Sequence, residues 1–131
     1  MNGPNFFIVG ASKSGTTSLY HYLNQHPEIF MCPEKEPSFF INHDVNQPLE
    51  FPKDLLSSSF IKRINQSSGD DLLGMDDYLN LFKGAEKEKI IGEASTDYLI
   101  FPSAAQAIHD FDPNAKIMVI LRNPFDAAYS E

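Results

Sequence analysis

Residues 6–19 read FFIVGASKSGTTSL, and this stretch decides the fold. Its apolar beginning, Phe6–Val9, is typical of a short buried strand, and Thr16 begins a segment with helical spacing of apolar side chains. Gly10 and Gly15 bound the loop between them. A strand, a glycine-bounded loop and a helix direct backbone N–H groups and the positive helix end at an anion, most often a phosphate. The stretch therefore predicts a phosphate-binding loop. The alternative is an ordinary strand-to-helix turn whose glycines serve tight packing.

The position of the lysine separates this loop from nucleotide hydrolases. In the Walker A pattern the lysine directly follows the second glycine. Thr16 occupies that position here, and Lys13 lies inside the loop. The loop is therefore less like that of an ATP or GTP hydrolase.

The rest of the chain alternates between strand-like and helix-like segments. Patterns of apolar residues predict strands at 5–9, 28–31, 90–94 and 117–121, and helices at 16–25, 76–82 and 103–111. Two prolines predict a loop at 32–38, and residues 41–74 are interpreted as irregular surface with one or two short helices. This alternation indicates an α/β fold: a parallel sheet with helical crossovers packed on its faces.

A second anion signal follows the last predicted strand. Arg122 comes directly after it, Asn123 is a good helix N-cap, and Pro124 suits the first helical position. Ligands of open parallel sheets bind at the carboxyl ends of the strands. We therefore expect Arg122 and the 10–17 loop at one edge, where they suit a ligand with two separated phosphate-type groups. The alternative for Arg122 is a structural salt bridge with Asp126.

Together these motifs resemble the sulfotransferases that use 3′-phosphoadenosine 5′-phosphosulfate (PAPS), most closely the heparan-sulfate-type and bacterial branch. Pro4–Leu19 is similar to the N-terminal motif of that family, and Lys35–Phe40 is similar to a Lys-Glu-Pro element of that branch. Ile120–Pro124, followed by Ala128–Ser130, is similar to the 3′-phosphate motif. The resemblance implies a P-loop-containing three-layer α/β/α fold with a central parallel sheet.

The resemblance also implies roles for individual residues. The backbone N–H groups of Ser14–Thr17 and the hydroxyls of Thr16 and Thr17 would hold the 5′-phosphate. Arg122 and Ser130 would bind the 3′-phosphate. Lys13 would stabilise charge on the leaving phosphate, and Glu36 would be the general base. The catalytic candidates are thus Glu36 and Lys13. The donor-binding candidates are Lys13, Ser14, Gly15, Thr16, Thr17, Ser18, Arg122 and Ser130.

Several of these assignments have alternatives. Glu36 lies in a charged stretch and could be a solvated loop carboxylate, and Ser130 could be an ordinary helix-surface residue. Ser38 stands where the family often has histidine. Residues 93–98 resemble a family segment near the acceptor and the donor, and the alternative there is helix capping by Ser95 or Thr96. Cys32 is interpreted as an inert loop residue.

The implied function is sulfuryl transfer from PAPS to a hydroxyl or amine, without a metal ion. The alternatives are a P-loop kinase of small molecules and a non-catalytic, truncated nucleotide-binding remnant. A kinase would need a carboxylate for magnesium at a strand end, and the strand before Arg122 offers none. Because the family is usually about twice as long, residues 1–131 are expected to be the N-terminal portion of one sulfotransferase domain. The sequence leaves open whether this portion is active alone.

The composition and the N-terminal sequence indicate which binding partners and which cellular location to expect for the protein. The chain has 131 residues, 42% of them hydrophobic, a net charge of −8 and one cysteine. This charge disfavours nucleic acid as a partner. The N-terminus lacks the basic region of a signal peptide, and apolar runs fall short of the roughly 18 residues of a membrane span. We expect a cytoplasmic protein that acts on a small-molecule or glycan acceptor. The oligomeric state is not indicated.

Overall fold

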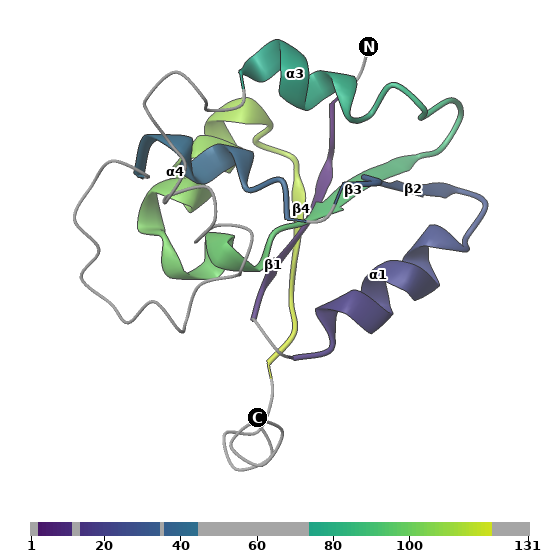
Figure 1. The fold of residues 1–131 in the computed structure, drawn as a ribbon, viewed down its shortest axis with the longest axis horizontal. Coiled ribbons are helices and arrows are strands. Elements are labelled where there is room, and N and C mark those ends of the chain that lie inside the picture. The colour runs from purple at the N-terminus through teal and green to yellow at the C-terminus, as the bar shows by residue number, and fades with distance from the viewer. Residues whose placement is uncertain (1–2, 12–13, 35, 45–73, 122–131) are drawn as a thin grey trace.

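The structure is a computed structural model, and it describes residues 3–11, 14–34, 36–44 and 74–121 (Figure 1). The strands are β1 (Phe6–Gly10), β2 (Ile29–Met31), β3 (Ile90–Ala94) and β4 (Lys116–Val119). The α-helices are α1 (Thr16–Asn24), α3 (Met75–Asn80) and α4 (Pro102–Phe111), and the 3₁₀ helices are η1 (Phe39–Asp44) and η3 (Thr96–Ile100).

The four strands form one parallel sheet in the order β2-β3-β1-β4. All five residues of β1 are buried, as expected for a strand that has neighbours on both sides and is covered on both faces. Gly92 lies opposite Phe6 in β3. A Cβ atom at Gly92 would lie 2.7 Å from the Phe6 ring and 2.9 Å from the Met31 sulfur, so a larger residue there would force these side chains to shift.

Alternation along β1 divides the apolar interior into two cores. Phe6 and Ile8 face α1 and pack with Tyr20. Phe7 and Val9 point to the opposite face, where η1, α3, η3 and α4 contribute a larger cluster. Helices therefore cover both faces of the sheet, which confirms the three-layer α/β prediction.

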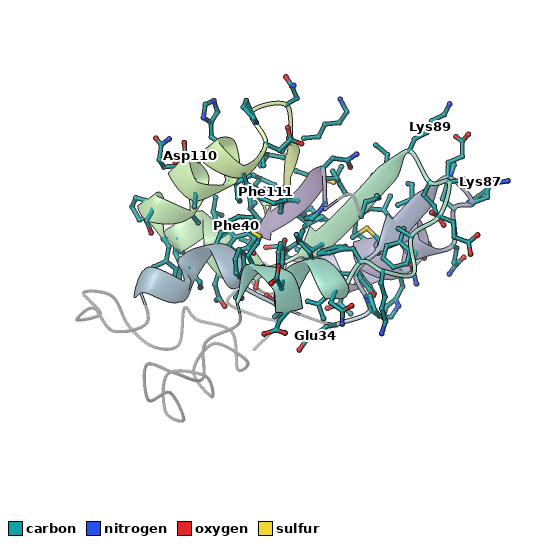
Figure 2. All side chains as sticks on the ribbon, turned by 90° about the horizontal axis from the view of Figure 1, so that it is seen from above. Glu34, Phe40, Lys87, Lys89, Asp110 and Phe111 are labelled. Atoms are coloured by element: carbon teal, nitrogen blue, oxygen red, sulfur yellow. The ribbon has the colours of Figure 1, made fainter. Side chains whose placement is uncertain are left out.

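Aromatic rings fill the larger core. Phe40 of η1 and Phe111 of α4 lie next to each other, with ring centroids 5.3 Å apart, while Asp110, Lys87 and Lys89 point outward (Figure 2). The Phe7 ring contacts Phe40 edge-on, with centroids 5.7 Å apart. These contacts place η1 directly over the central strand.

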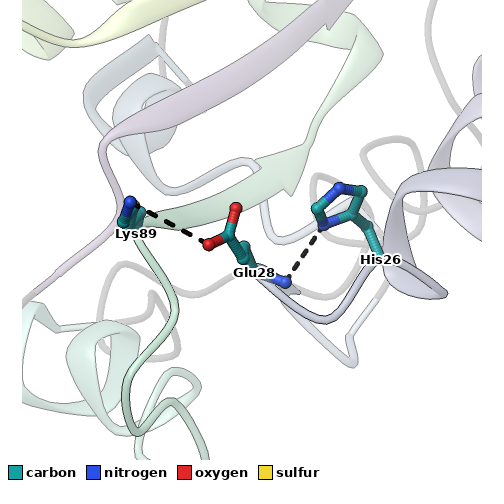
Figure 3. A network of polar contacts seen from close by, with 3 residues as sticks. All are labelled: His26, Glu28 and Lys89. Atoms are coloured by element: carbon teal, nitrogen blue, oxygen red, sulfur yellow. Dashed lines mark hydrogen bonds and ion pairs between the residues drawn. The ribbon is translucent and has the colours of Figure 1, made fainter.

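An exposed polar network joins the beginnings of β2 and β3. The backbone N–H of Glu28 donates a hydrogen bond to His26 Nδ1 at 3.0 Å, and Lys89 Nζ lies 3.9 Å from Glu28 Oε1 (Figure 3). Such exposed ion pairs contribute little to stability. His26, Glu28 and Lys89 are therefore surface residues before β2 and β3, and they are not part of the candidate site described below.

The predicted secondary structure is largely confirmed. All four strands are present, although β4 begins at Lys116 and ends at Val119. The prediction of helix 76–82 is wrong at its end, because α3 stops at Asn80 and turns lead to Gly84. Residues 32–34 and 36–38 form the expected loop. Residues 45–73 and the helix predicted after Asn123 lie outside the described residues.

Candidate functional site

The loop after β1 ends in a residue whose backbone conformation favours glycine. Gly15 has a φ of 87°, in the left-handed region, and serves as the N-cap of α1. Beyond its chain neighbours, none of the described residues has an atom within 4 Å of the position that its Cβ would occupy, so the backbone conformation is what favours glycine. The first hydrogen bond of α1 runs from the Leu19 N–H to the Gly15 carbonyl at 3.1 Å.

The start of α1 has the properties of an anion site. The first N–H groups of a helix have no partners within the helix and carry its positive dipole end. Neither an acidic residue in the first turn nor a side-chain hydrogen bond at the cap competes for them. Thr16 is buried, whereas Thr17 and Ser18 are exposed and Ser14 is half-buried. The predicted donor-binding residues 14–18 are therefore together at this helix end.

A small cavity joins this helix end to the loop after β2. Its volume is about 30 Å³, room for about one water molecule. It is lined by Thr16, Thr17, Tyr20, Glu34, Glu36 and Ala94. The cavity brings the predicted base, Glu36, to the helix end that carries the predicted phosphate-binding residues.

Glu36 is held by a residue that is distant in sequence. The backbone N–H of Thr96 donates to Glu36 Oε2 at 2.7 Å, and Thr96 Oγ1 lies 3.1 Å from Oε1. Glu36 is half-buried and hydrogen-bonded, unlike a solvated loop carboxylate. Burial raises the pKa of Glu36 to about 7; nearby Asp97 and Glu93 act in the same direction, and the bonds from Thr96 oppose them. A carboxylate with this pKa suits proton transfer near neutral pH.

A second carboxylate, that of Glu93, is fully buried close to the contact between Glu36 and Thr96. Glu93 accepts hydrogen bonds from the hydroxyls of Tyr78, of Tyr98 at 3.0 Å and of Ser95 at 2.5 Å. Ser95 Oγ in turn accepts the backbone N–H of Ser38 at 2.9 Å. Burial, together with the charge of Glu93, raises the pKa of both tyrosines, so they stay protonated and donate.

Sequence reasoning did not find this hydrogen-bonded network. Ser95 is the N-cap of η3, but its side chain makes no capping bond. The capping alternative for Ser95 is therefore wrong, because its hydroxyl bonds to Glu93 instead. The signal in the sequence was the position of Ser95 and Thr96 directly after a predicted strand, at the sheet edge where ligands bind.

The second predicted anion group lies partly outside the described residues. Backbone bonds of 2.8 Å run from Ile120 N–H to the Gly10 carbonyl and from Ala11 N–H to the Ile120 carbonyl. The chain leaving β4 therefore reaches the edge where the loop after β1 begins. Lys13, Arg122 and Ser130 are outside the described residues, so their contacts stay predictions.

Other candidate chemistry is weak in the described part of the chain. Cys32 is buried, and burial raises its pKa to about 12, so the thiol is a poor nucleophile. Residues 3–11, 14–34, 36–44 and 74–121 contain no group of three His, Cys, Asp or Glu residues placed to hold a metal ion. Within the same ranges, no helix has the length and apolarity needed to cross a membrane.

Known proteins share this architecture and sequence. The chain is 42% identical to a crystallised sulfotransferase from Alicyclobacillus acidocaldarius, with a TM-score of 0.79 over 99% of this chain and 49% of that one. It is 30% identical to the membrane-associated sulfotransferase kil1 of Dictyostelium discoideum, over 98% of this chain and 22% of that protein. It is also 30% identical to a bifunctional heparan sulfate N-deacetylase/N-sulfotransferase 1 of Caenorhabditis briggsae, over 97% of this chain and 12% of that protein.

The chain thus spans about half the length of the crystallised relative and a smaller share of the two curated ones. A model of the sulfotransferase family matches residues 4–131, which include every strand and helix described above. The chain belongs to the sulfotransferase family.

Proposed function

We propose that the protein transfers a sulfuryl group from PAPS to a hydroxyl or amine of an acceptor. One observation carries the proposal: Glu36, with a pKa of about 7, shares a cavity with Thr16 and Thr17 at the start of α1. A base and an anion-binding helix end are the two parts that such a transfer needs side by side. Membership of the family disfavours the kinase alternative.

The start of α1 suits the donor. Within the described part of the chain, the turn at Gly15 leaves space in front of it, and the first turn of the helix carries no opposing negative charge. The N–H groups of residues 14–17 and the threonine hydroxyls would hold the 5′-phosphate. Lys13 would contact the phosphosulfate bridge, and Arg122 and Ser130 would bind the 3′-phosphate.

The proposed transfer is an in-line displacement at sulfur. The acceptor oxygen or nitrogen forms a bond to sulfur while the bond from sulfur to the bridging oxygen breaks. Glu36 accepts the proton that the acceptor loses. The leaving phosphate takes up negative charge, which Lys13 and the N–H groups at the start of α1 stabilise. We propose no metal ion for this step.

The acceptor belongs to a broad class. One relative is named for heparan sulfate, which favours a glycan, and a small molecule remains the other acceptor of the proposal. The cytoplasmic location stays a prediction. So does the assignment of residues 1–131 to one domain as its N-terminal portion.

Calorimetric titration of the full-length natural protein with adenosine 3′,5′-bisphosphate tests the donor site. We expect binding without magnesium, and weaker binding by Lys13→Ala. Transfer from radiolabelled PAPS to a panel of hydroxyl and amine acceptors tests the reaction, and Glu36→Ala should lower its rate on the order of a hundredfold or more. Binding of ATP with magnesium but not of the bisphosphate would refute the proposal. Unchanged turnover by Glu36→Ala would remove Glu36 as the base.

A further inference from the structure

The loop that carries Glu36 has an unusual backbone. Glu36 has a φ of 53° and Ser38 a φ of 50°, both in the left-handed region although neither is glycine. Such residues persist only where their surroundings hold them, and they concentrate at functional sites. The loop therefore needs specific contacts to keep its shape.

Two adjacent residues supply these contacts from the carboxyl end of β3. Thr96 donates two hydrogen bonds to the Glu36 carboxylate, at 2.7 and 3.1 Å. Ser95 Oγ accepts the Ser38 N–H at 2.9 Å. Thr96 thus holds the side chain of the candidate base, and Ser95 holds the backbone of Ser38, two residues after Glu36. Ser95 and Thr96 are called the clamp below.

The buried carboxylate of Glu93 orients the clamp. The Ser95 hydroxyl has a single proton, which it donates to Glu93 Oε1 at 2.5 Å. Its oxygen is therefore free to accept the Ser38 N–H. The hydroxyls of Tyr98 and Tyr78 donate to the other oxygen of Glu93, which is fully buried. Hydrogen bonds to both oxygens thus fix the orientation of the Glu93 carboxylate. The fixed carboxylate in turn sets the direction in which the Ser95 hydroxyl points.

We propose that Ser95 and Thr96 are positioning residues that aim the Glu36 carboxylate at the proton of the acceptor. The inference rests on the proposed function, since it assigns the clamp a role in that same transfer. Thr96 leaves part of the carboxylate available, because Glu36 still lines the cavity shared with Thr16 and Thr17. The hydroxyl and the N–H of Thr96 then fix which lone pairs of Glu36 face the acceptor.

The clamp and the charges around Glu36 have opposite effects on the pKa of its carboxyl group. Among the described residues, the titratable groups near it are Glu93 of β3, Asp97 of η3, Glu34 of its own loop and Tyr20 of α1. The first two add to burial in favouring the protonated carboxyl, whereas the Thr96 bonds favour the ionised form. Removing the Thr96 hydroxyl should therefore make Glu36 harder to ionise.

The test compares Thr96→Val, which loses the hydroxyl but keeps the backbone N–H, with Thr96→Ser, which keeps both. In the full-length natural protein, Thr96→Val should lower kcat about tenfold, the usual effect of one hydrogen bond to a charged group. The KM for PAPS should change little, because the hydroxyl that this substitution removes bonds to the Glu36 carboxylate. The acid limb of the kcat/KM profile should move to higher pH, and Thr96→Ser should restore both values. If Thr96→Val does not fold, Thr96→Ala gives the same comparison.

A second readout separates this inference from the proposed function. The Glu36 carboxyl can be titrated by NMR in protein with isotope-labelled glutamate, with Glu36→Gln to assign its signal. An active enzyme in which Thr96→Val moves neither the acid limb nor this titration overturns the clamp. So does a loss of rate that is equal at every pH with an unchanged titration. If the protein transfers no sulfuryl group but the titration moves as expected, the proposed function fails and the clamp on the carboxylate stands.

Discussion

At the scale of single residues, Glu36 illustrates how burial turns an ordinary side chain into a chemical group for neutral pH. Its ordinary pKa of 4.5 rises to about 7, first because burial disfavours the charge and then because Asp97 and Glu93 lie near. The hydrogen bonds from Thr96 only partly offset these effects. Ionisation of the carboxylate therefore comes at some expense of stability.

This expense gives a stability test with a defined sign. The native pKa of Glu36 lies above the unfolded value, so the free energy of unfolding should fall as pH rises from 4.5 to about 7. Glu36→Gln carries no charge and lacks this fall. Its stability relative to wild type should increase by about 1–2 kcal/mol between roughly pH 4 and pH 8, a value reduced for the residual solvent access of Glu36. Urea unfolding at the two pH values measures it, and a pH-independent difference would contradict it.

Gly15 gives a second test at this scale. Gly15→Ala forces a Cβ atom into the left-handed region and should cost about 1 kcal/mol in the free energy of unfolding. It should also weaken binding of adenosine 3′,5′-bisphosphate, because the first N–H groups of α1 would shift. Gly74→Ala is the matched control, since Gly74 is also a helix N-cap but has an ordinary φ of −82°. Equal effects of the two substitutions would show that the φ of 87° is not what matters at Gly15.

At the scale of elements, the end of β3 connects the hydrophobic core to the candidate site. Glu93 belongs to β3, and Tyr78 and Tyr98 come from α3 and η3. Their bonds tie two core elements to the strand whose next residues hold the Glu36 loop. Buried networks of this kind are stabilising only when every member has a partner.

Glu93→Gln tests this network. The amide nitrogen cannot accept a hydrogen bond, so at least one of the bonds donated by Tyr78, Tyr98 and Ser95 is lost in the interior. We expect a loss of about 2 kcal/mol in the free energy of unfolding, measured by urea denaturation. Asp110→Asn makes the same chemical change on the exposed surface of α4 and should stay within about 0.5 kcal/mol of wild type. A Glu93→Gln protein as stable as this control would mean that the network does not hold the elements together.

Local patterns predicted the elements well and their long-range contacts poorly. The apolar run from Phe6 to Val9 identified the central strand because both of its faces are buried. The glycines and the start of α1 predicted the candidate anion site because N–H direction follows from local backbone. The bond between Glu36 and Thr96 joins residues 60 apart, and no periodicity encodes such a pairing. The left-handed φ of Glu36 likewise follows from contacts outside its own loop.

At the scale of the whole molecule, β4 is an edge strand of the sheet that the described residues form, and its surface is apolar. Ile117, Met118 and Val119 are exposed by 50%, 37% and 42%, and Leu121 by 75%. Beside the strand lies an apolar cavity of about 320 Å³, lined in part by Ile117, Val119 and Ile108 of α4. Exposed apolar edge strands are sites of association.

We therefore expect the purified chain of residues 1–131 to self-associate through β4. The double substitution Ile117→Lys with Val119→Lys should raise the monomer fraction severalfold, because lysine on an edge strand opposes pairing. Sedimentation velocity over a range of concentrations measures the effect. Met75→Lys replaces an isolated exposed apolar residue on α3 and should change the monomer fraction little. A chain that is monomeric at high concentration before any substitution would exclude β4 as a contact surface.

The environment of Cys32 has a practical consequence for following such events in solution. It is the sole cysteine in the sequence, and its side chain is enclosed and holds its proton until strongly alkaline conditions. Maleimide dyes attack thiolates that solvent can reach, so they should leave wild-type protein unlabelled. A cysteine introduced at the exposed Gln106 would then be the single attachment point for a fluorophore, without prior removal of the native thiol.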